Sequence, residues 1–409
     1  MSVRLEAIKL NHDPGAATAD ALTIRRNATQ TVAVPEWQWG VSVNPEDSPA
    51  AYAMKETQGQ TITIKVKLRS LDPKLGSVKV RAVDPTYQPH PGPGGCLGWL
   101  VWILKLLVRL LQGNVLGEVK ARTVTFPAGG VTGFETFELK NVDIQKAGVG
   151  ARTTTWRWQY RAAGGSWTDF ETTQHRIYVV AEMPKSPWTQ APGSTQLPWT
   201  EVLDYACKWA LLAKTPGEAA ERITRAVYEL GPSVVTYDCP GGGSSHYAGW
   251  SSFDATHFLE RLKGGLGNGI YVNCTDCATI VSTFANALGA DLWQSRMEPP
   301  AGSLFFGFDL NPMLGIGSAV WQTCCGWGAF SYHEVAWKDA CTANDAVYDA
   351  CLQVDGDADP TTAPHTPLQP VNLTFGGIGA GLYRDRLAAP AGRPNCEPNP
   401  GSRQRRAVA

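Results

Sequence analysis

The fold of this chain is decided by the stretch Tyr271-Val-Asn-Cys274-Thr-Asp276-Cys-Ala278 and by the residues that follow it as far as Leu288-Gly289. A glycine-rich run precedes it, Gly264-Gly-Leu-Gly-Asn-Gly269, which cannot hold a helix. After it, apolar residues recur at the i, i+3, i+4, i+7 spacing of a buried helical face, at Ala278, Val281, Phe284, Ala285 and Leu288. The stretch therefore predicts a buried helix, which Gly289 ends as a glycine at the C′ position.

This pattern places Cys274 in the first turn of the helix. N–H groups in a first turn have no partner inside the helix, and the positive end of the helix dipole lies close by, so a thiolate is favoured there. A thiolate is a nucleophile at neutral pH. Asp276, two residues further on, is expected to cap the start of the helix. These features make Cys274 a candidate nucleophile.

Three stretches, in order, resemble the transglutaminase-like superfamily of thiol enzymes. Cys274-Thr-Asp276-Cys-Ala278, followed nine residues on by Ala287-Leu288-Gly289, resembles its nucleophile helix. Ser331-Tyr-His333-Glu-Val-Ala-Trp337 resembles its histidine strand. Ala346-Val-Tyr-Asp349-Ala-Cys-Leu352 resembles the next strand, which carries the aspartate of the family. The resemblance covers the second half of the chain, from Pro198 to Leu352.

The resemblance implies an α+β, papain-like domain with a catalytic triad. Cys274 would be the nucleophile, His333 the general base and then the general acid, and Asp349 the carboxylate that orients the histidine. Such enzymes form a thioester from a peptide or carboxamide carbonyl and pass the acyl group to water or to an amine. The backbone N–H of Cys274 is expected to be one oxyanion-hole donor. A protein or peptide substrate follows from this reaction.

Two questions about function stay open at this point. Hydrolysis, by a protease or amidase, is slightly favoured over amine transfer, although no residue pattern decides between water and an amine as acceptor. The alternatives to an enzyme are a non-catalytic binding module and a membrane-acting effector, both built on the same scaffold. Intact Cys274, His333 and Asp349 favour the enzyme, because a decayed site commonly loses one of its members.

Other motifs carry weaker signals. Cys274 and Cys277 form a Cys-x-x-Cys, which leaves a redox pair or half of a zinc site as alternatives, but Cys324-Cys325 has poor spacing for the remaining ligands. The loop Asp238-Cys-Pro-Gly-Gly-Gly-Ser-Ser-His246-Tyr247 lacks the lysine of a phosphate-binding loop and is more typical of a lid beside a cleft. Asp355-Gly-Asp-Ala-Asp359 lacks the glutamate of a calcium loop. No cofactor or metal is therefore expected.

Composition limits the classes further. A chain of 409 residues is long enough for two or three domains, and a formal net charge of −1 gives no general attraction to nucleic acid. The N-terminus lacks the charged and apolar regions of a secretory signal, which predicts a cytoplasmic protein, with export by another route left open. Ten cysteines in such a chain are expected to be mostly reduced. The oligomeric state cannot be read from these features.

The first domain is expected at residues 1–182 and to be all-β. Period-two alternation marks half-buried strands at 2–10, 61–68, 77–83 and 154–160, with a closing strand at 174–180. Short strands with regular turn signals favour an antiparallel sandwich, immunoglobulin-like in its general form. A packing or recognition role suits this domain better than catalysis.

An apolar insertion interrupts these strands at residues 95–117. Its core, Leu97–Leu111, carries only a narrow polar stripe and is shorter than the roughly 20 residues that span a bilayer. Three interpretations remain open for it: a helix that lies over a core or groove, an interfacial membrane helix, and a helix that binds a partner.

The remaining boundaries follow from proline, glycine and capping signals. A linker is predicted at 183–197 and the catalytic domain at 198–360. The catalytic domain would open with a helix at 201–213, capped by Thr200, and with a second helix that begins after Thr215. Residues 361–409 are rich in proline and glycine, and the basic end of the chain is expected to be disordered.

Overall fold

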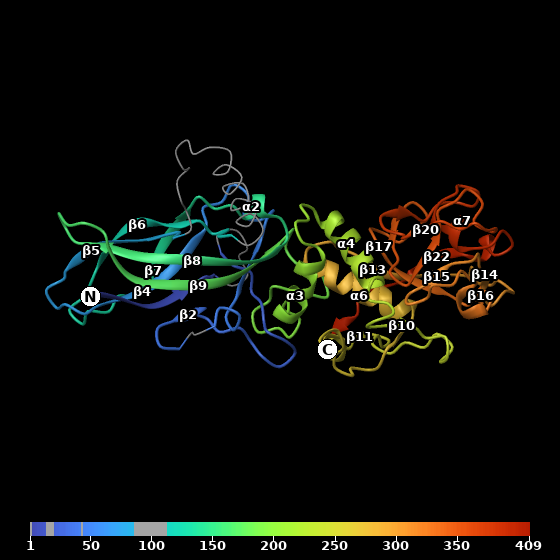
Figure 1. Ribbon diagram of the computed structural model, residues 1–409, viewed down its shortest axis with the longest axis horizontal. Helices are drawn as coiled ribbons and strands as arrows, with labels where there is room; N and C mark the ends of the chain where they lie inside the picture. The colour runs from blue at the N-terminus through green and yellow to red at the C-terminus, as the bar shows by residue number, and fades with distance from the viewer. Residues whose placement is uncertain (1, 14–19, 42–43, 86–112) are drawn as a thin grey trace, which may run out of the picture. The chain divides into compact units, whose positions relative to one another are not determined.

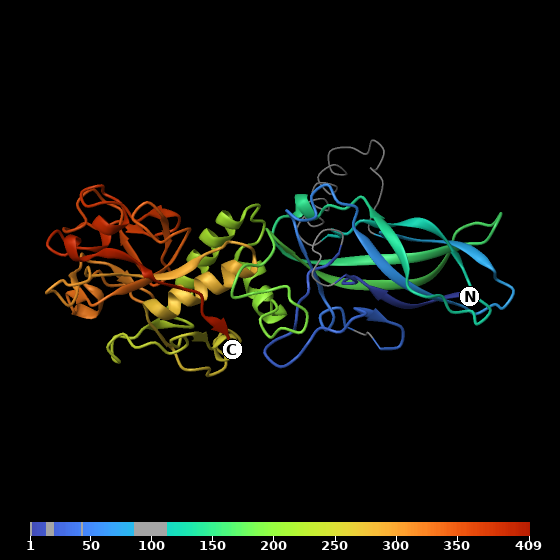
Figure 2. The ribbon, with the colours of Figure 1, turned by 180° about the vertical axis from the view of Figure 1, so that it is seen from behind.

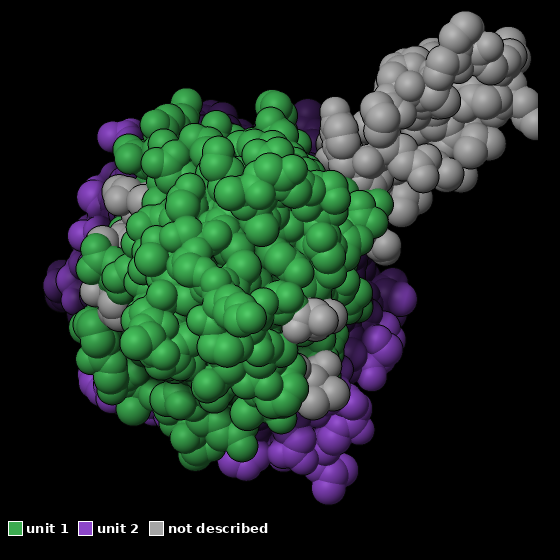
Figure 3. Space-filling view, turned by 90° about the vertical axis from the view of Figure 1, so that its left-hand side faces the viewer, with its two compact units in different colours: residues 1–183, 190–214 green, residues 184–189, 215–409 purple. Residues whose placement is uncertain are grey.

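The computed structural model describes residues 2–13, 20–41, 44–85 and 113–409. It divides the chain into two units, which Figure 3 colours green and purple. Unit 1 consists of residues 1–183 and 190–214, and unit 2 of residues 184–189 and 215–409. Most of the apolar insertion predicted at 95–117 falls outside the described residues.

Unit 1 is built on a nine-stranded sheet of order β2-β1-β4-β7-β6-β5-β8-β9-β3 (Figure 1). Its elements are β1 (Val3–Lys9), β2 (Trp37–Gln38), β3 (Ala50–Ala53), β4 (Thr63–Ser70), β5 (Ser77–Val83), β6 (Glu118–Thr125), β7 (Glu135–Lys140), α2 (Ile144–Ala147), β8 (Gly150–Arg161), β9 (Thr168–Val180) and α3 (Thr200–Trp209). Alternating burial along β4 and β5 confirms that period-two patterns mark strands in this part of the chain.

Strand β7 joins two groups of strands in unit 1, because it changes its partner along its length. The antiparallel, immunoglobulin-like sandwich expected here stays a prediction. Its first residues pair with β4, where Thr63 lies opposite Glu138, and its last two pair with β6, where Glu118 lies opposite Lys140. A strand that joins two groups of strands in this way connects them through one hydrogen-bonded order.

Helix α3 belongs to unit 1, although the sequence pattern suggested that it opens the catalytic domain. Its buried side, with Val202, Leu203 and Ala206, packs against β8 and β9. The N-cap residue is Trp199, whereas Thr200, expected to be the cap, lies inside the helix and donates its hydroxyl to the Arg26 carbonyl, 3.4 Å away.

The predicted linker at 183–197 is divided between the two units. Residues 184–189 join unit 2 because they bind helix α6 (Cys274–Ala287). The Trp188 indole N–H donates to the Thr283 carbonyl at 2.8 Å, and the Asn286 side chain donates to the Ser186 carbonyl at 2.7 Å. Residues 190–197 contact unit 1, where the Gln190 side chain accepts the Thr23 N–H at 2.8 Å.

Unit 2 contains a five-stranded sheet of order β21-β18-β17-β13-β22 and several short ribbons. Its helices are α4 (Pro216–Tyr228), α5 (Ala255–Leu262), α6, α7 (Tyr383–Leu387) and the 3₁₀ turns η1 (Cys324–Gly326) and η2 (Arg393–Asn395). Its strands are β10 (Thr236–Tyr237), β11 (Ser252–Phe253), β12 (Tyr271–Val272), β13 (Trp293–Glu298), β14 (Phe308–Asp309), β15 (Leu314–Gly315), β16 (Ala329–Phe330), β17 (His333–Trp337), β18 (Ala346–Tyr348), β19 (Leu352–Asp355), β20 (Pro367–Leu368), β21 (Leu373–Thr374), β22 (Glu397–Gln404) and β23 (Ala407–Val408).

Helix α6 packs against β13 and β17 of this sheet, and Figure 2 shows it from behind. Every residue of the helix is buried, whereas the sequence pattern predicted only one buried face. Two of its polar residues bond to the helix itself: the Thr279 hydroxyl donates to the Thr275 carbonyl and the Ser282 hydroxyl to the Ala278 carbonyl, both at 2.7 Å. Satisfied hydroxyl groups can be buried at little cost.

The end of the chain is ordered, contrary to the prediction of a disordered tail. Strand β22 pairs with β13, with Gln404 opposite Gln294, and β23 pairs in parallel with β11, with Val408 opposite Phe253. Arg406, between these two strands, is 2% exposed. The basic residues of this segment were expected to be exposed to solvent. Arg406 is instead buried, because the Glu334 carboxylate, 2.6 Å away, compensates its charge.

Two further findings concern the environment of the chain. In the parts of the chain that the structure describes, no helix combines the length and apolarity needed to cross a membrane. Cys239 and Cys325 form a disulfide, whereas six described cysteines are free.

Candidate active site

Cys274 is the first residue of α6, and Asn273 alone separates it from β12. Asn273 is the N-cap, and its side chain accepts the Asp276 N–H, while the Asp276 carboxylate accepts the Asn273 N–H. This capping box fixes the backbone on both sides of Cys274. The amide N–H of Cys274 points out of the helix end without an intrahelical acceptor. The Cys274 residue is 5% exposed and is therefore buried close to the surface.

His333 begins β17, the strand that packs on α6. It is completely buried and lies opposite Met297 of β13 in the antiparallel ladder. The ring of Phe330 is stacked on the imidazole with 5.1 Å between centroids and 6° between planes. The strand and the stacked ring together hold the imidazole in one orientation, as a catalytic histidine requires.

Asp349 follows β18 at the point where this strand leaves the sheet. Strands β17 and β18 pair with Ala336 opposite Tyr348, and continuing this register places Asp349 opposite Val335, on the face that also carries His333. The structure brings the two side chains together: His333 Nε2 lies 2.9 Å from Asp349 Oδ2. The predicted pairing of the histidine strand with the aspartate strand is therefore confirmed.

The Asp349 carboxylate has two further donors. The Tyr383 hydroxyl donates to Oδ2 at 2.7 Å, and the Cys351 N–H donates to Oδ1 at 2.7 Å. The Gln369 side chain donates to the Asp349 carbonyl oxygen, and the Asp349 N–H donates to the Pro370 carbonyl at 2.8 Å. The side chain and the backbone of Asp349 are therefore both held in place by hydrogen bonds.

The electrostatics of His333 reflect these neighbours. Burial lowers the pKa of His333, but the charge of Asp349, the hydrogen bond to it and the nearby Cys274 thiol outweigh burial and raise this pKa to about 10. Nδ1 is buried and makes no hydrogen bond of ordinary geometry to any described residue. Since Asp349 engages Nε2, Nδ1 is the ring nitrogen that remains for Cys274. The three predicted residues thus lie in the order thiol, imidazole, carboxylate.

A loop covers the N-terminal end of α6. The buried Asp276 carboxylate accepts the N–H groups of His246, Tyr247 and Ala248 at 2.7–2.9 Å. Burial raises the pKa of Asp276, and these backbone hydrogen bonds lower it only in part. Asp276 does help to cap the helix, as predicted, but as the N3 partner of the N-cap residue Asn273. The loop contacts add a second role that the sequence did not indicate.

The disulfide between Cys239 and Cys325 ties this loop to the 3₁₀ turn η1, with a Cα–Cα distance of 5.4 Å. Asp238, next to it, accepts the Gly241 N–H at 2.7 Å and lies 3.1 Å from His246 Nε2. His246 therefore helps to hold the loop in place. The Gly-rich segment is clamped from both ends.

Cysteine neighbours and cavities complete the description. A hydrogen bond to Cys351 lowers the pKa of Cys277, but burial together with the charges of Asp276 and Asp349 outweighs it, and the net pKa is raised, which favours the thiol. No group of three metal-ligating side chains is found within the described ranges. The larger described cavity, about 390 Å³, lies in unit 2 beside Gln369 and does not include Cys274 among its lining residues. A second, of about 170 Å³, lies in unit 1.

Several residues of the site could not be found from the sequence. Tyr383 lies in the segment expected to be a proline-rich tail, 34 residues after Asp349, and no motif links the two. Phe330 stands three residues before His333, and only its aromatic character pointed to packing. Glu334 and Thr275, which follow the histidine and the cysteine, bind each other at 3.0 Å.

Comparison with known proteins adds little to this geometry. No family model matches the chain, and no curated protein matches it. Among solved structures, it is similar to a red sea bream transglutaminase, with 12% sequence identity and a TM-score of 0.33. The match covers 95% of this chain and 55% of the transglutaminase, so the chain spans about half the length of that protein. A similarity at this level does not establish a shared activity.

Proposed function

We propose that this chain is a cysteine-dependent acyl-transfer enzyme that acts on peptide or carboxamide bonds. One observation carries the proposal: a buried histidine with Asp349 at 2.9 Å on one ring nitrogen and with its other nitrogen left for a cysteine at a helix N-terminus. Nucleophile, base and orienting group in this order are the requirement for covalent catalysis.

The protonation state suits the first half of the reaction. Because the pKa of His333 is raised to about 10, the ring is an imidazolium at neutral pH and can give a proton. Cys274 Sγ would attack the carbonyl carbon and form a C–S bond, and the oxygen would take the negative charge beside the Cys274 N–H. As the C–N bond breaks, His333 would protonate the departing amine or ammonia and leave a thioester.

The second half would reverse the role of the histidine. Neutral His333 would remove a proton from water or from a primary amine, which attacks the thioester carbonyl and releases the Cys274 thiolate. Asp349 would stabilise the imidazolium in both halves and hold the ring through Nε2. We favour hydrolysis slightly over amine transfer. The substrate experiment described below distinguishes water from an amine as the acceptor.

The alternative is a non-catalytic binding module. The specific observation in its favour is the cover over the site, since His333 is fully buried and Cys274 is 5% exposed. A scaffold of this kind could retain the triad for packing alone. The effector alternative depends on Leu97–Leu111, which lies outside the described residues.

The test is the rate of Cys274 alkylation by iodoacetamide as a function of pH, followed by mass spectrometry. Rapid modification well below the free-thiol pKa of about 8.5, abolished in His333→Gln, is expected. Cys277, one turn along the same helix and also buried, is the internal control and should react slowly. Slow modification of Cys274 that does not depend on His333 would favour the binding module.

Substrate class is tested next, with peptides that contain glutamine or asparagine and with unmodified peptide bonds. Ammonia release without a second substrate indicates amide hydrolysis, and cleavage of the peptide indicates a protease. Incorporation of a labelled primary amine into the peptide indicates transfer. Cys274→Ala is the matched negative control for all three measurements.

A further inference from the structure

Arg406 occupies a position that the proposed chemistry does not use. It is 2% exposed and stands between β22 and β23, near the end of the chain. A buried guanidinium is retained only where several partners compensate its loss of hydration. The partners of Arg406 therefore indicate what it holds in place.

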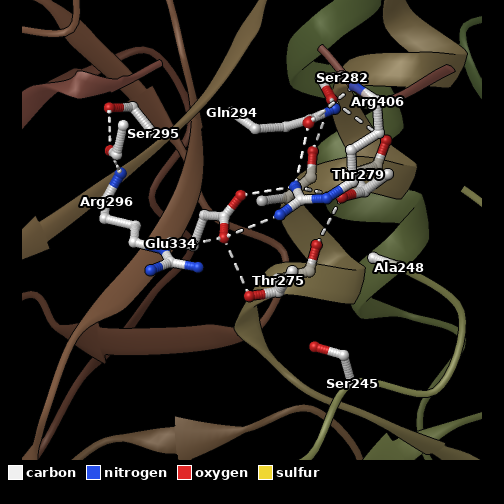
Figure 4. A network of polar contacts seen from close by, with 12 residues as sticks. Ser245, Ala248, Thr275, Thr279, Ser282, Gln294, Ser295, Arg296, Glu334 and Arg406 are labelled. Carbon is white, nitrogen blue, oxygen red and sulfur yellow. Dashed lines mark hydrogen bonds and ion pairs between the residues drawn. The ribbon is translucent and has the colours of Figure 1, made fainter. Parts of the chain in front are cut away.

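These partners come from separate elements of unit 2. Arg406 Nη1 donates to Glu334 Oε1 at 2.6 Å, to Thr279 Oγ1 at 3.0 Å and to Gln294 Oε1 at 3.0 Å, and Nε donates to the Gly249 carbonyl at 2.7 Å. They belong to β17, α6, β13 and the segment that follows the covering loop. Figure 4 shows the guanidinium at the centre of this network.

Glu334 extends the network to the two reacting groups. Its carboxylate is 1% exposed, and its second oxygen, Oε2, accepts the Thr275 hydroxyl at 3.0 Å (Figure 4). Glu334 follows His333 on β17, and Thr275 follows Cys274 on α6. The bond between them therefore joins the histidine strand to the first turn of the nucleophile helix, one residue away from each reacting side chain.

The other partners of Glu334 and Gln294 indicate that Arg406 is the main contact of both side chains. Arg296 Nε lies 3.5 Å from Glu334 Oε2, a longer contact than the one from Arg406. The Gln294 side chain donates to the Ser282 hydroxyl at 2.8 Å, which leaves its oxygen for the guanidinium. Arg406 thus determines where the Glu334 carboxylate lies, and Glu334 in turn determines the separation of β17 from the start of α6.

We propose that Arg406 is a positioning residue, which sets the distance and orientation of Cys274 relative to His333 through Glu334 and Thr275. This inference rests on the proposed function, because it concerns the same thiol and imidazole. It goes beyond that function by assigning a role in the site to a residue near the end of the chain. A misplacement of about 1 Å in a catalytic group is enough to lower a rate by about 10²-fold.

The experiment measures alkylation of Cys274 against pH in Arg406→Met, together with thermal unfolding of each variant. We expect the inflection to move up towards the free-thiol value of about 8.5 and the rate at pH 7 to fall by roughly tenfold. Arg406→Lys keeps the charge and should recover part of the rate. Arg405→Met is the matched control: Arg405 lies in the same segment but binds Asp291 at 2.6 Å and the Leu292 carbonyl, so the profile should not change.

A second variant covers the case in which Arg406→Met does not fold. Thr275→Val removes only the hydroxyl that links Glu334 to α6, and leaves the ion pair with Arg406 intact. Its profile should move in the same direction by a smaller amount. If Arg406→Met folds and has the wild-type profile, the positioning role is overturned and the proposed function stands. If Arg406→Met does not fold, a wild-type profile of Thr275→Val has the same meaning. A wild-type profile that is indifferent to His333→Gln overturns the proposed function, and the positioning role with it.

Discussion

Two buried histidines, one in each unit, show how the same residue takes different roles. His175 on β9 is 1% exposed and has the Thr173 hydroxyl 2.9 Å from Nε2. Burial lowers the pKa of His175 to about 3, so its ring is neutral. His333 is equally buried, but the carboxylate of Asp349 contributes to raising its pKa to about 10.

The difference shows that depth alone does not identify a functional histidine. A neutral imidazole that contacts a hydroxyl and the ring of Trp156, 5.1 Å away between centroids, contributes to a core. An imidazolium between a carboxylate and a thiol can move a proton. Three predictions test whether the carboxylate is the cause of this difference.

The largest effect is expected from Asp349→Asn, which should make His333 resemble His175. Without the carboxylate, burial is unopposed and the pKa of His333 should fall below its ordinary value of 6.5. Alkylation of Cys274 at pH 7 should fall by on the order of 10²–10⁴-fold, the usual contribution of a general acid or base. Mass spectrometry gives the rate, and an NMR titration gives the pKa.

The control for this substitution is Asp355→Asn. Asp355 pairs with His365 at 2.7 Å in the same unit, and its loss also removes a carboxylate–histidine contact. The alkylation of Cys274 should be unchanged in this variant. An equal fall of the alkylation rate in both variants would mean that Cys274 responds to the loss of any carboxylate in unit 2. Asp349 would then not explain the difference between His333 and His175.

The next effect concerns the dependence of stability on pH, where the two histidines should act in opposite ranges. The raised pKa of His333 gives a contribution that is complete below pH 6.5 and is lost as pH rises from 6.5 to about 10. The lowered pKa of His175 gives one that is complete above pH 6.5 and is lost as pH falls from 6.5 to about 3. Within each range, the slope is about 1.4 kcal/mol per pH unit for one proton.

Calorimetry of unfolding between pH 4 and 10 checks this prediction. His333→Gln should flatten the alkaline side of the stability curve, and His175→Gln should flatten the acid side. Each variant is the control for the other, because the two residues lie in different units. Identical changes on the same side of the curve would contradict the assignment.

The smallest effect is expected from Tyr383→Phe, which removes one donor from Asp349 but leaves His333 and the Cys351 N–H in place. A hydrogen bond to a charged group contributes roughly 1.5–3 kcal/mol, so the thermal stability of the variant should decrease and the Cys274 alkylation rate should fall several-fold at most. Tyr348→Phe is the matched control, since this buried tyrosine bonds to Asn372 at 3.4 Å instead. A loss as large as that of Asp349→Asn would assign Tyr383 a larger part in holding the histidine.

The sequence predicted those parts of the site that depend on neighbouring residues. Capping by Asp276, the position of Cys274 at a helix start and the pairing of the histidine and aspartate strands all follow from local patterns, and the structure has each of them. Period-two alternation likewise located the strands of unit 1.

What the sequence could not predict depends on contacts between distant residues. The Thr279 and Ser282 hydroxyl groups are satisfied within α6, so these two polar positions are buried although they look solvent-facing. Strand β7 pairs with two neighbours because of how the whole sheet is connected. Tyr383 bonds to Asp349, 34 residues away in the sequence, and Arg406 bonds to Glu334, 72 residues away. The composition of these segments, rich in proline or in basic residues, did not indicate either contact.

The buried tail has a consequence for the order in which the molecule is made. Gln294 and Arg406 are 112 residues apart in the chain, and Thr279 and Arg406 are 127 apart. Contacts with so high a contact order form late, because the loop between them must close first. During synthesis, Cys274 and His333 leave the ribosome well before Arg406 does. We therefore expect the thiol to remain imperfectly aligned with the imidazole until the segment around Arg406 has folded. The Cys274 thiol of a growing chain should then be less reactive than that of the folded protein.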